Sequence, residues 1–147
     1  MNILKKIIAI ALLLTISACA TPYQEMAALG GVKATRLSSD RAQIVAVVNG
    51  YTDRSVAEQY ALLKAAEYTI ENGYGHFAII SQAADANKET NFTYNYYTGF
   101  QTYSFENPRN DITIKMYAGS APSNAPMNIY DARSIVTTLG SQVLRPS

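Results

Sequence analysis

The chain has 147 residues, of which 48% are hydrophobic, and this length and composition suit one domain with a packed core. Its 12 basic and 11 acidic residues give a formal charge of +1, which excludes the strongly basic surface expected of a nucleic-acid-binding protein. The chain holds one cysteine and one histidine, so no internal disulfide can form and packing alone must hold the fold.

The first 18 residues have the pattern of a secretory signal peptide. Lys5 and Lys6 form a short positive region, and the segment 7–16 is apolar apart from Thr15. About ten apolar residues are too few to span a bilayer, which takes roughly 20. Removal of residues 1–18 leaves ten basic and eleven acidic residues, and therefore a net charge near −1.

The leader ends in Ile16-Ser17-Ala18-Cys19, which resembles the bacterial lipobox with isoleucine in place of the usual leucine. The resemblance implies that the Cys19 thiol takes a diacylglycerol, that the leader is cut before Cys19, and that the new amine is acylated. Two or more acyl chains anchor a protein stably where one does not. The alternative is an ordinary secretory signal with no role for Cys19. Ala20 is not acidic, which favours the outer membrane where the enterobacterial sorting rule applies.

Residues 19–32 are expected to form a lipidated tether with a loosely docked end, followed by a single globular domain over residues 33–147. The segment has no sustained hydrophobic period and includes Gly30-Gly31, which is costly to order. A tether of this length would hold the domain away from the bilayer.

The first two elements of the domain are expected to be strands. A short strand is predicted over residues 33–37 and a second over residues 43–48, separated by a turn at residues 38–41. The run from Ile44 to Val48 is apolar at every position, which favours a central strand covered on both faces.

A helix is predicted over residues 55–72. Ser55 and Glu58 have the spacing of a capping box, and Gly73 supplies a left-handed stop. The apolar residues recur every three or four positions and mark the face that packs on the sheet: Val56, Tyr60, Leu63, Ala66 and Ile70.

Glu67 lies at the edge of that apolar face, and a buried carboxylate needs a partner. One interpretation makes Glu67 the acid or base of an enzyme. A structural ion pair is favoured, because no second carboxylate, nucleophile or metal ligand accompanies it. The candidate partners are Lys64, Arg36, Arg41 and Arg133.

Residues 19–82 contain several short motifs that occur together, among them Thr21-Pro22-Tyr23, Asn49-Gly50-Tyr51-Thr52 and Tyr60-Ala61-Leu62-Leu63-Lys64-Ala65-Ala66-Glu67. On these motifs the chain resembles a small family of uncharacterised bacterial envelope lipoproteins. The resemblance implies one compact domain at the cell envelope and brings no catalytic residue with it. Lys64 stands where the family pattern has arginine, which weakens a bidentate pairing with Glu67.

A further strand is predicted over residues 76–81. Strand, helix and strand in this order favour a crossover that leaves residues 43–48 and 76–81 parallel. His76 is the only histidine, and a metal site would need more ligands nearby, so a strand-edge histidine without a special role is expected.

The segment 83–91 is polar and is expected to be a loop, and the segment 92–105 is rich in aromatic residues. The second segment is interpreted as a strand or hairpin with a bulge or turn at Gly99. Its rings form a candidate surface for binding a protein or a glycan. The alternative is that they cover a sheet face. The residues concerned are Tyr94, Tyr96, Tyr97 and Tyr103.

The remaining chain is predicted to contain a turn at 107–110, a strand at 111–117, a loop at 118–127 and a last helix capped by Asn128. The strand has the cleanest alternation, with Ile112, Ile114 and Met116 facing inward. The helix should lie beside the first one through an apolar stripe that comprises Ala132, Ile135, Val136, Leu139 and Val143.

The order β-β-α-β-β-β-α predicts an α+β two-layer sandwich, with a mixed, mostly antiparallel sheet and both helices on one face. Our first functional hypothesis is a non-catalytic envelope lipoprotein that faces the periplasm and supports assembly or binds another protein. The second is a glycan- or small-molecule-binding module that uses the tyrosine-rich segment. A lipoprotein hydrolase ranks third, and no metal, cofactor or nucleic-acid partner is expected.

Overall fold

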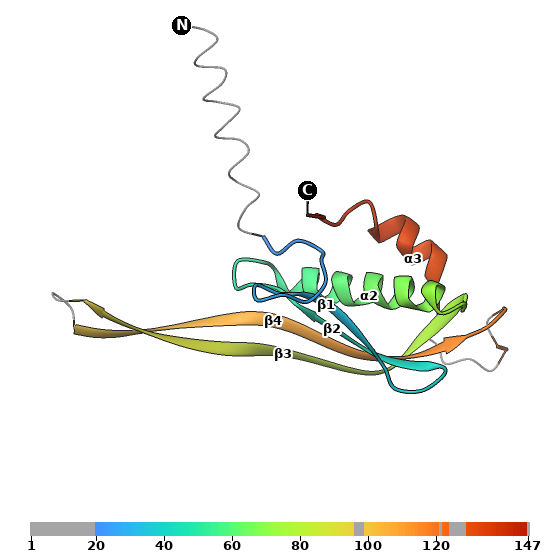
Figure 1. Cartoon of the computed structure of the whole chain (residues 1–147), viewed down its shortest axis with the longest axis horizontal. Coiled ribbons are helices and arrows are strands. Elements are labelled where there is room, and N and C mark those ends of the chain that lie inside the picture. The colour runs from blue at the N-terminus through green and yellow to red at the C-terminus, as the bar shows by residue number, and fades with distance from the viewer. Residues whose placement is uncertain (1–19, 96–98, 121, 124–128, 147) are drawn as a thin grey trace, which may run out of the picture.

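The computed structural model describes residues 20–95, 99–120, 122–123 and 129–146. One sheet carries both helices on the same side, and two neighbouring strands, residues 76–95 and 99–117, run on past the others at the left of Figure 1. The elements are β1 (Gly31–Arg36), β2 (Arg41–Val47), α2 (Arg54–Glu71), β3 (His76–Asn95), β4 (Gly99–Tyr117), β5 (Ile129–Asp131) and α3 (Ala132–Leu139).

The predicted α+β class and the order ββαβββα are confirmed. The five strands lie in the order β1-β2-β4-β3-β5, and each neighbouring pair is antiparallel, so the sheet is fully antiparallel rather than mixed. β2 and β3 do point the same way, as the crossover predicts. They do not touch, because β4 lies between them.

The core lies between the sheet and α2. Along β4 the predicted alternation is confirmed, since Ile112, Ile114 and Met116 are all buried. In β2 the buried positions are Ala42, Ile44 and Ala46, whereas Val45 and Val47 are only partly buried. The expected second cover over the run from Ile44 to Val48 is not found in the described part of the chain.

Helix α2 begins one residue earlier than predicted, and its cap is different. Asp53 is the N-cap and its carboxylate accepts a hydrogen bond from the Ser55 amide at 2.8 Å, so the predicted capping box of Ser55 and Glu58 is wrong. An aspartate carboxylate satisfies an exposed helix amide as well as a serine does. The stop at Gly73 is confirmed, because this residue has a φ of 82°.

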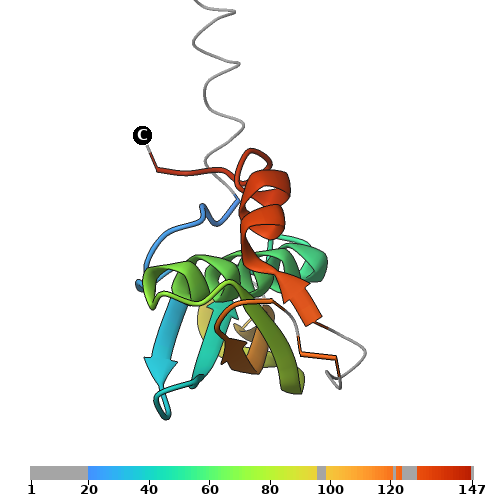
Figure 2. The same cartoon turned by 90° about the vertical axis from the view of Figure 1, so that its right-hand side faces the viewer.

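Helix α3 packs against α2, as predicted, and lies farther from the sheet than α2 does (Figure 2). Its cap is Asp131, which accepts from the Ser134 amide at 2.7 Å, and not Asn128, which lies outside the described residues. Ala132 is fully buried, and the rest of the predicted stripe packs against the core with partial exposure. Residues 129–131, predicted as the first turn of this helix, form the edge strand β5 instead.

The second half of the sheet is one long hairpin of β3 and β4. The loop predicted at 83–91 and the turn predicted at 107–110 are wrong, because both segments pair across the hairpin in continuous register. Pro108 of β4 lies opposite the point at which β2 ends. Its carbonyl accepts a hydrogen bond from the Val48 amide at 3.0 Å, and its nitrogen faces the same edge of β4. Because β2 does not continue along that edge, the missing N–H of proline leaves no strand pairing incomplete.

Beyond the pair Asp85 and Arg109, β3 and β4 contact no other strand in the described residues and form a two-stranded ribbon, which we call the arm. Asn95 pairs with Gly99, which confirms the hairpin interpretation of the tyrosine-rich segment. The arm projects from the body of the domain in Figure 1.

The described part of the expected tether is docked on the domain. Thr21, Tyr23 and Val32 are 2%, 5% and 1% exposed, and both Tyr23 and Val32 belong to the core. A loose tether over residues 20–32 is therefore wrong, and the glycine pair has another purpose. A Cβ on Gly30 would clash with the Val47 carbonyl, and one on Gly31 would lie 2.7 Å from the Gln24 carbonyl.

Candidate functional site

Glu67 lies where α2 meets both ends of the described chain. Its Oε2 accepts a hydrogen bond from the Tyr23 hydroxyl at 2.6 Å, and its Oε1 accepts from Arg145 Nη2 at 3.0 Å. The Arg145 guanidinium also lies 5.0 Å from the centre of the Tyr23 ring. The Glu67 side chain is 21% exposed, so it is a partly buried structural acid.

None of the partners predicted for Glu67 binds it in the structure. Lys64 pairs with Glu25 at 2.6 Å, and Arg36 contacts Tyr68 and Asn72. Tyr23 comes from the segment expected to be a loose tether, and Arg145 lies in the segment that follows α3. Tyr23 is 44 positions away and Arg145 is 78 positions away, which local sequence patterns do not reveal.

Tyr23 is held in its neutral form. Burial is the largest cause that raises the pKa of Tyr23 well above its usual range, and the hydrogen bond to Glu67 raises it further. The ring packs edge-on against Tyr60 with centroids 5.2 Å apart, and the Tyr60 hydroxyl donates to the Thr21 carbonyl at 2.8 Å. Burial also raises the pKa of Tyr60. These contacts fasten the N-terminal segment to α2.

His76 opens β3 at the edge next to β5. Its Nδ1 lies 2.9 Å from the Gly119 carbonyl, which can only accept, so Nδ1 carries a proton. Its Nε2 lies 3.5 Å from a carboxylate oxygen of Asp131. The pKa of Asp131 is lowered chiefly by its hydrogen bonds to Ser134, with a smaller effect from His76. The contacts of His76 therefore serve the junction between β3, β5 and α3.

The tyrosine-rich segment lies on the arm. Tyr94 belongs to β3 and pairs with Phe100, and Tyr103 belongs to β4 and pairs with Asn91. Tyr96 and Tyr97 lie outside the described residues. The ladder places this segment at the far end of the arm, beyond the part of the sheet that α2 covers.

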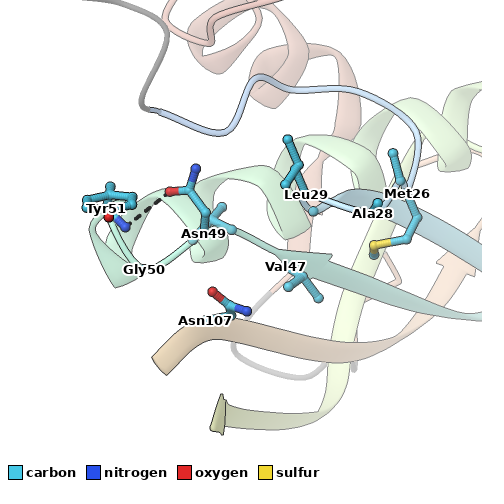
Figure 3. A pocket seen from close by; sticks show the side chains of 11 residues that line it. Met26, Ala28, Leu29, Val47, Asn49, Gly50, Tyr51 and Asn107 are labelled. Carbon is cyan, nitrogen blue, oxygen red and sulfur yellow. Dashed lines mark hydrogen bonds between the residues drawn. The ribbon is translucent and has the colours of Figure 1, made fainter. Parts of the chain in front are cut away.

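A pocket of about 340 Å³ lies where the N-terminal segment meets the end of β2. We call it the N-terminal pocket; it is formed by residues 26–30, residues 47–51 and Asn107. Figure 3 shows Met26 and Leu29 on one side and Tyr51 on the other, with Val47 between them and Asn107 below. Sequence reasoning missed this pocket. The available signal was the apolar pair Met26 and Leu29 within a segment expected to be a tether.

The N-terminal pocket is framed by hydrogen bonds on its polar side. The Asn49 side-chain oxygen accepts from the Tyr51 amide at 3.2 Å and from the Thr52 hydroxyl at 2.8 Å. The Asn49 amide in turn donates to the Thr21 hydroxyl at 2.8 Å. The loop after β2 is thereby fixed to the first described residues of the chain.

Several expected features lie outside the description or are not seen in it. Cys19 is not among the described residues. Within the described ranges, no three His, Cys, Asp or Glu side chains are grouped to hold a metal ion, and no helix is long and apolar enough to cross a membrane. Comparison of the chain with protein-family models, with curated proteins and with solved structures finds no match.

Proposed function

We propose that the protein is a lipid-anchored lipoprotein of the bacterial envelope, attached through Cys19 and facing the periplasm, with a non-catalytic role in assembly or protein binding. The outer membrane is the favoured location because Ala20 follows the cysteine. The observation that carries the proposal is the sequence Ile16-Ser17-Ala18-Cys19, which holds the only cysteine of the chain at the position where lipidation takes place.

The surroundings of the titratable groups support a non-catalytic role. Glu67 is engaged by a tyrosine and an arginine, and the two ring nitrogens of His76 face a carbonyl and a helix-capping carboxylate. In the described part of the chain, each buried side-chain nitrogen or oxygen has a hydrogen-bond partner. Groups used in this way stabilise the fold and are poorly placed to exchange protons with a substrate.

The arm supports a role in contact with another protein. In the described residues, β3 has no strand partner on its outer edge beyond Ala78, and β4 has none on its other edge before Arg109. Exposed strand edges present unpaired N–H and C=O groups, to which another chain can add a strand. The alternative function is glycan or small-molecule binding by Tyr94, Tyr96, Tyr97 and Tyr103.

Cell fractionation of a Cys19→Ser variant tests the anchor. The wild-type chain should sediment with membranes, be released only by detergent and incorporate labelled palmitate, whereas the variant should incorporate no label. A matched Ser17→Ala variant keeps a small residue in the leader and should still be labelled. If Cys19→Ser incorporates palmitate as wild type does, the acyl chains are attached elsewhere.

In vivo crosslinking separates the two roles of the domain. A protein partner should be captured by the wild-type chain and identified by mass spectrometry. The variant Tyr94→Ala with Tyr103→Ala should lose glycan binding at an unchanged unfolding temperature if the domain is a glycan-binding module. If this variant unfolds instead, the rings contribute to the fold rather than to a binding surface.

A further inference from the structure

The N-terminal pocket carries a concentration of exposed apolar side chains. Among the described residues outside 84–106, six large hydrophobic residues are exposed, and three of them line this pocket. Leu29 and Tyr51 are each 76% exposed, and Met26 is 36% exposed. Exposed apolar side chains gathered around one pocket favour a surface that contacts another molecule or a membrane.

The chain enters the domain between the two halves of this pocket. The Thr21 hydroxyl donates to the Leu29 carbonyl at 3.4 Å, and the Thr21 amide donates to the Thr52 hydroxyl at 3.1 Å. Cys19 is two residues before Thr21, so its Cα lies within about 7 Å of the Thr21 Cα. Any lipid on Cys19 therefore starts next to the pocket.

The geometry points to a membrane-docking surface: we infer that in the acylated protein the N-terminal pocket rests on the bilayer, with Leu29 and Tyr51 in the interfacial layer. This inference rests on the proposed lipidation of Cys19. Leucine favours the apolar boundary, and tyrosine is enriched at membrane interfaces, where its ring is buried and its hydroxyl is hydrated.

One of the charges next to the pocket in sequence is already paired within the domain. Glu25, next to Met26, forms an ion pair with Lys64 at 2.6 Å, which reduces its repulsion of anionic lipids. The consequence is a fixed orientation. The domain lies against the membrane by its N-terminal pocket, because too little chain separates the anchor from Thr21 to hold the domain away.

Fluorescent labelling of the full acylated chain in phosphatidylethanolamine and phosphatidylglycerol vesicles tests this orientation. A Leu29→Cys variant carries one reactive thiol, because the Cys19 sulfur is held in a thioether. A Ser39→Cys variant is the matched control, since Ser39 is exposed in the turn at the opposite end of β1 and β2. Both substitutions are at exposed positions, so neither should disturb the fold.

The label at residue 29 should be quenched by nitroxide-bearing lipids and lose its quenching by iodide in water, and the label at residue 39 should behave oppositely. Equal iodide quenching at both positions in an acylated, vesicle-bound protein would overturn the docking surface and leave the proposed anchor intact. Protection of residue 29 that depends on protein concentration in detergent would assign the pocket to a second copy instead. If the mature chain carries no fatty-acid mass, both proposals fail.

Discussion

The two ends of the β3–β4 hairpin have very different surroundings. Near His76 and Tyr117 the pair is flanked by β2 and β5 and covered by α2, and Phe77, Ile114 and Met116 are buried there. We call this end the root. Beyond Asp85 and Arg109 the same two strands pair only with each other, among the residues described.

This difference separates the part of the molecule that stabilises the fold from the part that extends from it. A two-stranded ribbon alone is marginally stable in water, whereas strands that pack against a helix bury enough apolar area to fold. The contacts that contribute most to the free energy of unfolding are therefore those in the root and those between α2 and the segments bound to it.

Truncation of a root side chain should have the largest effect. Phe77 is fully buried and stacks on Tyr130 with centroids 5.3 Å apart. Phe77→Ala should lower the free energy of unfolding by about 3–5 kcal/mol, because it removes buried area and leaves a cavity. Urea denaturation of the detergent-solubilised chain measures this loss. A decrease below about 1 kcal/mol would mean that the root is loosely packed.

Removal of the Glu67 carboxylate should have the next largest effect. In Glu67→Ala the Tyr23 hydroxyl loses its acceptor and Arg145 loses its ion pair. We expect a decrease of about 1–3 kcal/mol in the free energy of unfolding, for the most part from the unsatisfied Tyr23 hydroxyl. Glu71→Ala, at an exposed position on the same helix, is the control and should change stability by less than about 0.5 kcal/mol. Equal effects of the two variants would contradict the network.

High pH should weaken the docking of the N-terminal segment. The pKa of Tyr23 is raised in the folded chain, so the folded state retains this proton where the unfolded state loses it, near pH 10. The contribution of this proton to the free energy of unfolding is fully present below that pH. Above it the free energy of unfolding should fall by about 1.4 kcal/mol per pH unit for one proton. Tyr23→Phe should reduce this slope in thermal melts between pH 9 and pH 11. An unchanged slope would show that Tyr23 ionises freely.

Shortening the arm should have the smallest effect on stability. Asn87 and Asn107 are paired, so an Asn-Gly turn can replace residues 88–106 between them. The free energy of unfolding should change by no more than about 1 kcal/mol, because the root stays intact and the loop becomes shorter. The same variant should lose its crosslinked partner. Collapse of the fold in circular dichroism spectra would show that the arm is part of the core.

The sequence predicted those elements whose secondary structure follows from the spacing of neighbouring apolar residues. The apolar spacing of α2 and the alternation from Ile112 to Met116 identified both elements and their buried faces. The strand at residues 83–91 was missed because this segment is polar and has no apolar period from which a strand could be predicted. The structure pairs it with β4 in continuous register.

The contacts at the N-terminal segment could not be predicted for a different reason. Tyr23, Glu67 and Arg145 meet from three distant parts of the chain, and nothing local marks them as partners. Gly30 and Gly31 were interpreted as flexible, whereas the structure uses them for close backbone approach. The N-terminal pocket depends on these contacts, so it was missed with them.

Intact mass spectrometry of the protein purified from bacterial membranes tests the central claim most directly. We predict a polypeptide that begins at Cys19 and carries the mass of a diacylglyceryl group with an additional acyl chain on its amine. A polypeptide that begins elsewhere, or one with an unmodified thiol at residue 19, would contradict the anchor on which the proposed function rests.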